Sequence, residues 1–320
     1  MQISEDLKPK PVMVGKKTAG KPFRRVIARD WELYLLALPA VALVLVFCYL
    51  PMYGVFIAFQ NYLPAKGVFG STFVGFKHFA AFIRDPFFNR IVANTVLLGV
   101  YTLIFSFPAP ILFALLLNEL RNGAFKKTVQ TISYMPYFIS TVIVIGFVVE
   151  LFGLSSGVVN DALAALGLQR INFLDRSEWF RPLYIGSGIW QGVGYSSIIY
   201  LAAISGINPE LYESALIDGA GRLRQAIHIT LPSIAPAIQV LFIFAVGGIL
   251  GNDFQKILLM YTPNTYETAD VISTYVFRKG ILGGQYSYSA AVGLCLSVIS
   301  LGLIMLTNFV NKKLGADHLY

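Results

Sequence analysis

The residues of this chain best suited to handle a solute are Asn252, Asp253, Gln255 and Lys256. Asp253 and Lys256 are three residues apart, so on a helix the carboxylate and the ammonium could pair on one face. Two aromatic residues of an earlier apolar stretch, Trp190 and Tyr195, complete the set. Polar groups that bond hydroxyls, together with aromatic faces that cover pyranose rings, predict a sugar pathway. An ion pair near the lipid headgroups explains the charged residues equally well.

A second polar segment, residues 213–232, consists of small residues and charges between two long apolar stretches. Asn208 and Pro209 predict the start of a short helix, since Pro is favoured at the first helical position. Gly219 offers a sharp turn that a larger residue would resist, and a second short helical segment over 221–228 follows. A helix–turn–helix beneath a membrane is what a mechanical coupling element requires. An ordinary amphipathic loop at the interface would show the same pattern.

Catalytic and metal-binding patterns are missing from the sequence. The three histidines are scattered, and neither HExxH nor paired CxxC motifs occur. Leu282–Gln285 is similar to the LSGGQ signature of ATPases but lacks its Ser, and no complete phosphate-binding loop is present. We therefore expect no enzyme activity and no cofactor bound by this chain.

The composition is that of a membrane protein. Of 320 residues, 56% are hydrophobic and 13% charged, with mean hydropathy +0.65, whereas a soluble domain carries about 25% charged residues. Six stretches contain no Asp, Glu, Lys or Arg, and each reaches the roughly 20 residues that a helix needs to cross the hydrocarbon. The sequence predicts an all-α integral membrane protein with six transmembrane helices, at about 33–59, 91–117, 130–151, 183–205, 232–256 and 286–310.

The basic residues predict the orientation. Eight Lys and Arg residues lie in residues 1–32, beside the first span, which usually dominates topology. We therefore expect a multi-pass protein with a cytoplasmic basic tail (1–32), a transmembrane domain (33–310) and a cytoplasmic C-terminal tail (311–320). The net charge of +8 follows from this bias and from attraction to lipid, and predicts no nucleic-acid partner.

The segment between the predicted fourth and fifth spans, residues 208–232, resembles the EAA loop of binding-protein-dependent ABC importer permeases. That motif reads EAA, three residues, G, nine residues, I, one residue, LP. The spacing matches here, with Ser214 in place of the middle alanine. The matching positions are Glu213, Ser214, Ala215, Asp218, Gly219, Ala220, Ile229, Leu231 and Pro232.

The resemblance extends over nearly the whole chain. It is similar to the polysaccharide branch of type I sugar permeases, which includes importers of alginate and aldouronates. Segments that carry it are WELYLLALP (31–39), YLPMYGVFIAF (49–59), FPAPILFALLLNEL (107–120), SYMPYFIS (133–140), IIYLAAISGINPELYESALIDGA (198–220) and ADVISTYVFRKGI (269–281).

The resemblance implies a type I importer half in a bacterial cytoplasmic (inner) membrane, taking up oligo- or polysaccharides. It implies a second permease subunit, a dimeric ABC ATPase that binds ATP and Mg, and an extracytoplasmic solute-binding protein as partners. It also implies that Glu213 contacts the ATPase and that Gly219 permits the turn of the coupling helix. Lys256, Arg278 and Lys279 would suit an acidic, uronate-containing sugar near the outer mouth.

Two other classes of protein fit the sequence less well. An ion- or proton-coupled secondary carrier would need titratable residues at mid-membrane, and the charge-free spans argue against it. A membrane enzyme would need a catalytic constellation, which the sequence lacks.

Overall fold

The computed structural model describes residues 31–313 and divides the chain into two units, residues 1–54 and 55–320. The predicted tails therefore lie mostly outside the described residues. In the first unit, helix α2 (Trp31–Val44) continues through a π-helical turn, η1 (Leu45–Tyr49), into α3 (Leu50–Met52) and the start of a 3-10 helix, η2 (Tyr53–Phe59).

Among residues 55–313, the second unit consists of helices, connecting loops and one antiparallel pair of two-residue strands, β1 (Gln60–Asn61) and β2 (Thr72–Phe73), in which Gln60 pairs with Phe73. Its first half contains α4 (Lys77–Ile83), α5 (Phe88–Tyr101), η3 (Thr102–Ser106), α6 (Pro108–Glu119), α7 (Ala124–Tyr134), η4 (Met135–Phe138), α8 (Thr141–Phe152) and α9 (Val158–Ala165).

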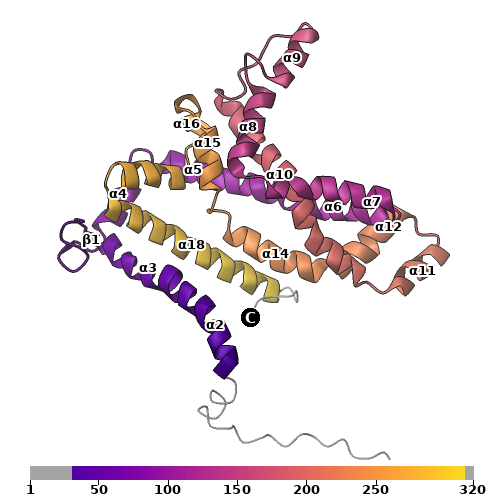
Figure 1. Ribbon diagram of the computed structural model, residues 1–320, viewed down its shortest axis with the longest axis horizontal. Helices are drawn as coiled ribbons and strands as arrows, with labels where there is room; N and C mark the ends of the chain where they lie inside the picture. The colour runs from indigo at the N-terminus through magenta and orange to yellow at the C-terminus, as the bar shows by residue number, and fades with distance from the viewer. Residues whose placement is uncertain (1–30, 314–320) are drawn as a thin grey trace, which may run out of the picture. The chain divides into compact units, whose positions relative to one another are not determined.

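The second half contains α10 (Ser177–Ser205), α11 (Pro209–Ile217), α12 (Arg222–Gln225), η5 (Ala226–Thr230), α13 (Leu231–Ser233), α14 (Ala235–Gly247), α15 (Phe254–Met260), η6 (Pro263–Thr265), α16 (Tyr266–Ala269), α17 (Ile272–Val276), η7 (Phe277–Leu282) and α18 (Tyr286–Lys313). Helix α10 packs on α6, and α14 packs on α18 (Figure 1).

Three helical stretches are long and apolar enough to cross a membrane, 31–59, 88–119 and 286–313. Two bent helix pairs, over 124–152 and 222–247, raise this number to five among the described residues. Helix α10 is 29 residues long, but Gly, Ser and Gln interrupt its apolar residues. The mostly helical membrane architecture agrees with the sequence, and the count of six spans stays a prediction.

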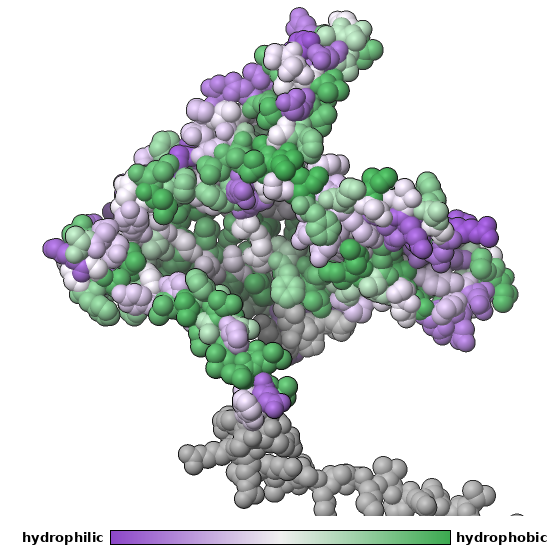
Figure 2. Space-filling view, viewed as in Figure 1, coloured by the Kyte–Doolittle hydropathy of each residue, from purple (hydrophilic) through white to green (hydrophobic). Residues whose placement is uncertain are grey.

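The 208–232 loop and the segment from β1 to α4, which six spans with a cytoplasmic N-terminus would place on opposite sides of the membrane, lie at opposite ends of the second unit. Helices α11 and α12 lie together at the right of Figure 1, and β1 and α4 lie at the left. In Figure 2, hydrophilic residues gather at the α11–α12 end.

The predicted third and fifth spans are not continuous helices. The third bends by 105° between α7–η4 and α8, because Pro136 starts a 3-10 turn and Ile139 and Ser140 are extended. The carbonyl of Ile139 accepts a hydrogen bond from the Gln191 side chain at 3.0 Å, which satisfies the broken backbone. The fifth ends at Gly247, and helix resumes only at Phe254.

Three π-helical turns each end two residues before a proline, at Pro51, Pro108 and Pro232. In an α-helix the proline ring would clash with the carbonyl four residues earlier, which here lies inside the π-turn. A π-turn is wider than an α-helical turn and leaves room for the ring. It is closed by hydrogen bonds over five residues, such as that from Phe107 N to Thr102 O at 3.2 Å. The helices therefore accommodate these prolines without losing the local hydrogen bonding that lipid demands.

The small residues of the fourth and fifth spans have different roles. A Cβ on Gly194 would lie 2.0 Å from the backbone oxygen of Ser133, and one on Gly247 would lie 2.3 Å from Ile304. These two glycines allow close helix packing within the chain. A Cβ on Gly186 would meet nothing within 4 Å.

We expect Gly194→Ala to destabilise the protein by about 1–3 kcal/mol, because the new methyl overlaps rigid backbone. Gly186→Ala is the matched control on the same helix and should be neutral or stabilising by up to about 1 kcal/mol. Thermal unfolding of the purified protein in detergent measures both. Equal transition temperatures for the two variants would contradict the packing assigned to Gly194.

Candidate functional site

The 208–232 loop forms two short helices joined by a glycine turn. Asn208 caps α11, its side chain accepting a hydrogen bond from Glu210 N, as the sequence predicts for a helix that begins at Pro209. Gly219 has φ +75°, in the left-handed region where only glycine is unstrained. After the turn, α12 runs through the π-turn η5 into α13 and the fifth span.

Hydrogen bonds across the 208–232 loop tie its two helices together. The hydroxyl groups of Tyr212 and Thr230 lie 2.9 Å apart, and Thr230 is 2% exposed. The Gln225 side chain donates to the carbonyl oxygen of Ala220 at 2.8 Å. The Tyr212–Thr230 contact joins α11 to the helical stretch that leads into the fifth span, and the Gln225 contact stabilises the turn between the two helices.

The outer surface of this loop exposes both charged and large apolar side chains. Glu213 and Asp218 are exposed, and so are several large apolar side chains. These are Leu211, Leu216, Ile217, Leu223 and Ile227, and Ile217 is 88% exposed. Of the other motif positions, Ser214 and Pro232 are exposed, and Ala215, Ala220, Ile229 and Leu231 are half-buried. Exposed apolar side chains rimmed by charges mark an interaction surface.

A row of adjoining cavities follows one stripe of α10. Arg181 and Ile185 line the first, of about 510 Å³. Ile185, Gly188 and Gly192 line the second, of about 350 Å³. The third, of about 410 Å³, is lined by α10 from Tyr195 onward. The lining residues recur at helical spacing and cover about 27 Å along the axis, close to the thickness of the hydrocarbon core.

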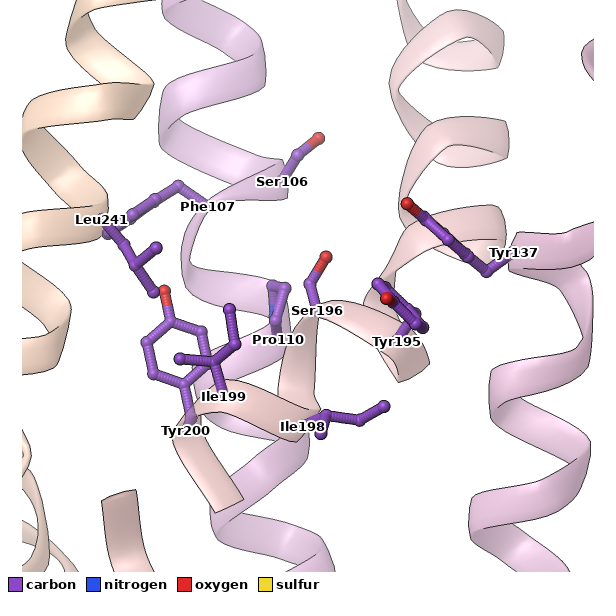
Figure 3. A pocket seen from close by; sticks show the side chains of 10 residues that line it. All are labelled: Ser106, Phe107, Pro110, Tyr137, Tyr195, Ser196, Ile198, Ile199, Tyr200 and Leu241. Carbon is purple, nitrogen blue, oxygen red and sulfur yellow. The ribbon is translucent and has the colours of Figure 1, made fainter. Parts of the chain in front are cut away.

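Hydroxyl groups and tyrosine rings line the third cavity. The rings of Tyr137 and Tyr195 stack with centroids 3.8 Å apart and planes 6° apart. Figure 3 shows these two rings side by side, with the hydroxyl groups of Ser106 and Ser196 turned toward the open space. Ser106 also lines the second cavity, so the two adjoin. Rings and hydroxyl groups together suit a carbohydrate.

The charged residues predicted for the pathway lie at the second cavity. Asp253 and Lys256 both line it, and Asn252 lines a neighbouring cavity of about 420 Å³ together with Asp253. The two side chains are not paired as the sequence allowed. Asp253 caps α15 by accepting from Lys256 N at 3.0 Å, and the Lys256 ammonium donates to Tyr184 O at 2.8 Å.

Two other predicted pathway residues lie elsewhere. Trp190 is on a different face of α10 from Tyr195 and lines a separate cavity with Phe147 and Glu150. Five helical positions separate the two aromatic residues, which rotates them well apart around the helix axis. Gln255 points outward from α15 and is exposed. The structure therefore keeps Tyr195, Asn252, Asp253 and Lys256 along the row of cavities.

Four further residues line these cavities and were not predicted from the sequence: Tyr137, Thr102, Ser106 and Gln191. Thr102 and Ser106 belong to the π-turn before Pro108, and Tyr137 lies in the 3-10 turn at the break of the third span. A search for prolines inside apolar stretches would have pointed to these positions, since irregular backbone in a membrane occurs where it lines a cavity.

The two other basic residues expected at the outer mouth are paired within the chain. Arg278 donates to both carboxylate oxygens of the fully buried Asp270, at 2.9 and 2.6 Å. Lys279 pairs with Asp85, which also accepts from the hydroxyl of Tyr275 at 2.8 Å. Both residues therefore have a carboxylate partner within the chain, and the expectation that they suit an acidic sugar stays a prediction.

Comparison with known proteins identifies the class. Residues 79–316 match the family of binding-protein-dependent transport system inner membrane components. The chain belongs to this family, the permease subunits of ABC importers, and has their type I fold. It is 46% identical to a polygalacturonan/rhamnogalacturonan transport system permease protein of Bacillus subtilis, over 96% of both chains.

Other relatives point the same way. An arabinooligosaccharides transport system permease protein of Bacillus subtilis is 29% identical over 89% of this chain and 88% of its own. The crystal structure of a bacterial alginate ABC transporter, in complex with an alginate pentasaccharide-bound periplasmic protein, contains a chain with TM-score 0.86 and 44% identity. The match covers 93% of this chain and 100% of that one. These similarities do not favour an ion-coupled secondary carrier.

The pKa of the Asp85 carboxyl predicts how the stability of the fold depends on pH. Burial acts to raise its pKa, but hydrogen bonds from Lys279, Phe87 N and Tyr275 outweigh burial and lower it. The ionised carboxylate therefore stabilises the fold. Its contribution is complete above about pH 4 and is lost as the pH falls through the lower folded-state value.

We expect Asp85→Asn to lower the transition temperature at pH 7, and the difference from wild type to shrink as the pH falls below about 4. Asp161→Asn is the control, because the Asp161–Arg170 pair is exposed and worth about 0–1 kcal/mol. Thermal unfolding between pH 3 and pH 7 measures both. A pH-independent difference for Asp85→Asn would contradict the lowered pKa.

Proposed function

We propose that this chain is one of two permease subunits of an ATP-driven importer of oligosaccharides, including acidic ones. The observation that carries the proposal is the 208–232 loop, a hydrogen-bonded helix pair with an exposed apolar tip that continues directly into the fifth span. Such a loop suits the transmission of movement between a soluble motor and a membrane helix.

The motor is a dimeric ABC ATPase, which binds ATP and Mg. The permease chain itself binds no cofactor. Its groove receives α11, with Ile217 and Leu216 as apolar anchors and Glu213 beside a basic residue of the ATPase. When ATP closes the ATPase dimer, the loop moves as one body with the fifth span. The cavities then open alternately to the two sides, a rigid-body switch.

The substrate class is supported by the cavities and by the relatives. Tyrosine rings and hydroxyl groups line the third cavity, and Asp253 and Lys256 line the second. The relatives are named for polygalacturonan, rhamnogalacturonan and alginate, which are acidic polysaccharides. A second permease, a different chain, completes the pathway, and an extracytoplasmic solute-binding protein delivers the sugar.

The proposed topology places the 208–232 loop and both chain ends in the cytoplasm. The separation of α11–α12 from β1 and α4 in Figure 1 supports opposite sides for these segments.

The variant Ala215→Cys should form a crosslink to a cysteine placed in the groove of the ATPase, because Ala215 lies half-buried on α11.

Uptake by the complete complex tests the proposal. Proteoliposomes that contain both permeases, the ATPase and the solute-binding protein should accumulate labelled oligogalacturonate when ATP is supplied on the ATPase side. A non-hydrolysable ATP analogue should abolish accumulation. Uptake that continues with the analogue, or that follows an imposed ion gradient, would refute the proposal.

Gly219 provides a test of the loop itself. Gly219→Pro should reduce ATP-driven uptake at least about tenfold, because Pro cannot adopt positive φ and lacks the N–H that donates to Leu216 O. Gly219→Asn is the matched control and should retain most activity, since Asn tolerates the left-handed region. Membrane content of both variants, measured by immunoblot, should equal wild type. Normal uptake by Gly219→Pro would rule out the coupling role.

A further inference from the structure

The Lys256 ammonium, unlike the side chains of Arg278 and Lys279, has no carboxylate partner among the described residues. Lys256 is 4% exposed, and its side chain lines the second cavity. Within residues 31–313, no carboxylate oxygen lies within 4.0 Å of its nitrogen. Arg278 pairs with Asp270, which Arg90 also approaches at 3.7 Å, and Lys279 pairs with Asp85.

The protein holds this ammonium at the cavity wall with a neutral group. One of its donors bonds Tyr184 O at 2.8 Å, and the nitrogen lies 4.7 Å from the centre of the Tyr184 ring. A Cβ at position 188 would lie 3.1 Å from the nitrogen, so Gly188 leaves the space that the ammonium occupies. An ammonium has three donors, so the described residues leave donors free for a ligand.

Asp253 balances this charge only at a distance. Its carboxylate lines the same cavity but accepts from the backbone N–H of Lys256 rather than from the ammonium. A buried ammonium without a paired anion is costly, and charged groups within membrane segments are by default functional. Its free energy falls most when an anion enters the cavity.

We propose that the Lys256 ammonium binds a carboxylate of an acidic oligosaccharide as the sugar passes the second cavity, and so favours uronate over neutral sugars. This proposal rests on the proposed import function. The neighbouring Thr102, Ser106 and Gln191 side chains line the same cavity. The Thr102 hydroxyl donates to Leu98 O and the Gln191 amide to Ile139 O, so their oxygens are left to accept from the ring hydroxyls. Selection therefore occurs within the permease, in addition to any selection by the solute-binding protein.

The test compares two substrates that differ in charge and in the ester methyl groups. Oligogalacturonate of one defined length and its methyl ester have the same rings and linkages, but the ester has no anionic carboxylates. In the reconstituted complex, Lys256→Met should lower uptake of the acid about tenfold at sub-saturating concentration, the loss of one charged hydrogen-bonded contact. Uptake of the ester should change less than about twofold.

Two controls separate this effect from others. Lys77→Met removes an exposed positive charge from α4 and should change neither uptake. The solute-binding protein is the same in every sample, so its own preference cancels in each ratio of variant to wild type. Equal losses of acid and ester uptake in Lys256→Met would overturn the proposal while leaving the import function in place. A wild-type complex that imports neither would overturn both.

Asp253→Asn supplies a second test in case Lys256→Met does not fold. Asn keeps the cap on α15 and removes the negative charge that opposes an incoming carboxylate. Acid uptake at sub-saturating concentration should rise about threefold relative to ester uptake. An unchanged ratio, or a ratio that shifts toward the ester, would overturn the assignment of this cavity to a carboxylate.

Discussion

Within a membrane, every backbone N–H and C=O must find its partner inside the protein, and this structure is organised around that constraint. Polar side chains form hydrogen bonds at two interruptions of the helices. Gln191 donates to the carbonyl of Ile139 at the break of the third span, and Asn252, in the break after α14, donates to the carbonyl of Thr95 in α5 at 3.1 Å. In the π-turns before the prolines, backbone hydrogen bonds alone satisfy the backbone groups. As a result, polar groups collect at the breaks, and the row of cavities follows them along α10.

The same helical continuity links the two parts of the proposed mechanism. The 208–232 loop is cross-tied by Tyr212 and Thr230, and the helix that follows it passes without a break in hydrogen bonding from α12 through η5 to α13. This helix bends by 66° into α14, and after the break that follows α14 come Asp253, the cap of α15, and Lys256 in α15. The proposed ATPase contact and the wall of the cavity are therefore neighbours along the chain, separated by one bend and one break.

Local features were predictable in detail. Asn208 as a cap, Pro209 as the first helical residue and Gly219 as a left-handed turn follow from backbone preferences that act within a few residues. Contacts between distant segments were not. The sequence predicted Trp190 and Tyr195 in one pathway, yet the two side chains face different cavities. It predicted Arg278 and Lys279 as groups for a ligand, yet they pair with carboxylates of the same chain. No rule based on spacing places residues that are many positions apart.

The sequence by itself determined that the chain is a helical membrane protein, and it determined the conformation of the 208–232 loop. Both follow from short-range physics, the transfer of apolar segments into lipid and the φ preferences of Gly and Pro. Only the tertiary structure decided where the third and fifth spans break and which charges are left unpaired. The ammonium of Lys256 is held by the Tyr184 carbonyl of α10, in the space that Gly188 leaves, and not by a carboxylate. That arrangement depends on how two distant helices pack.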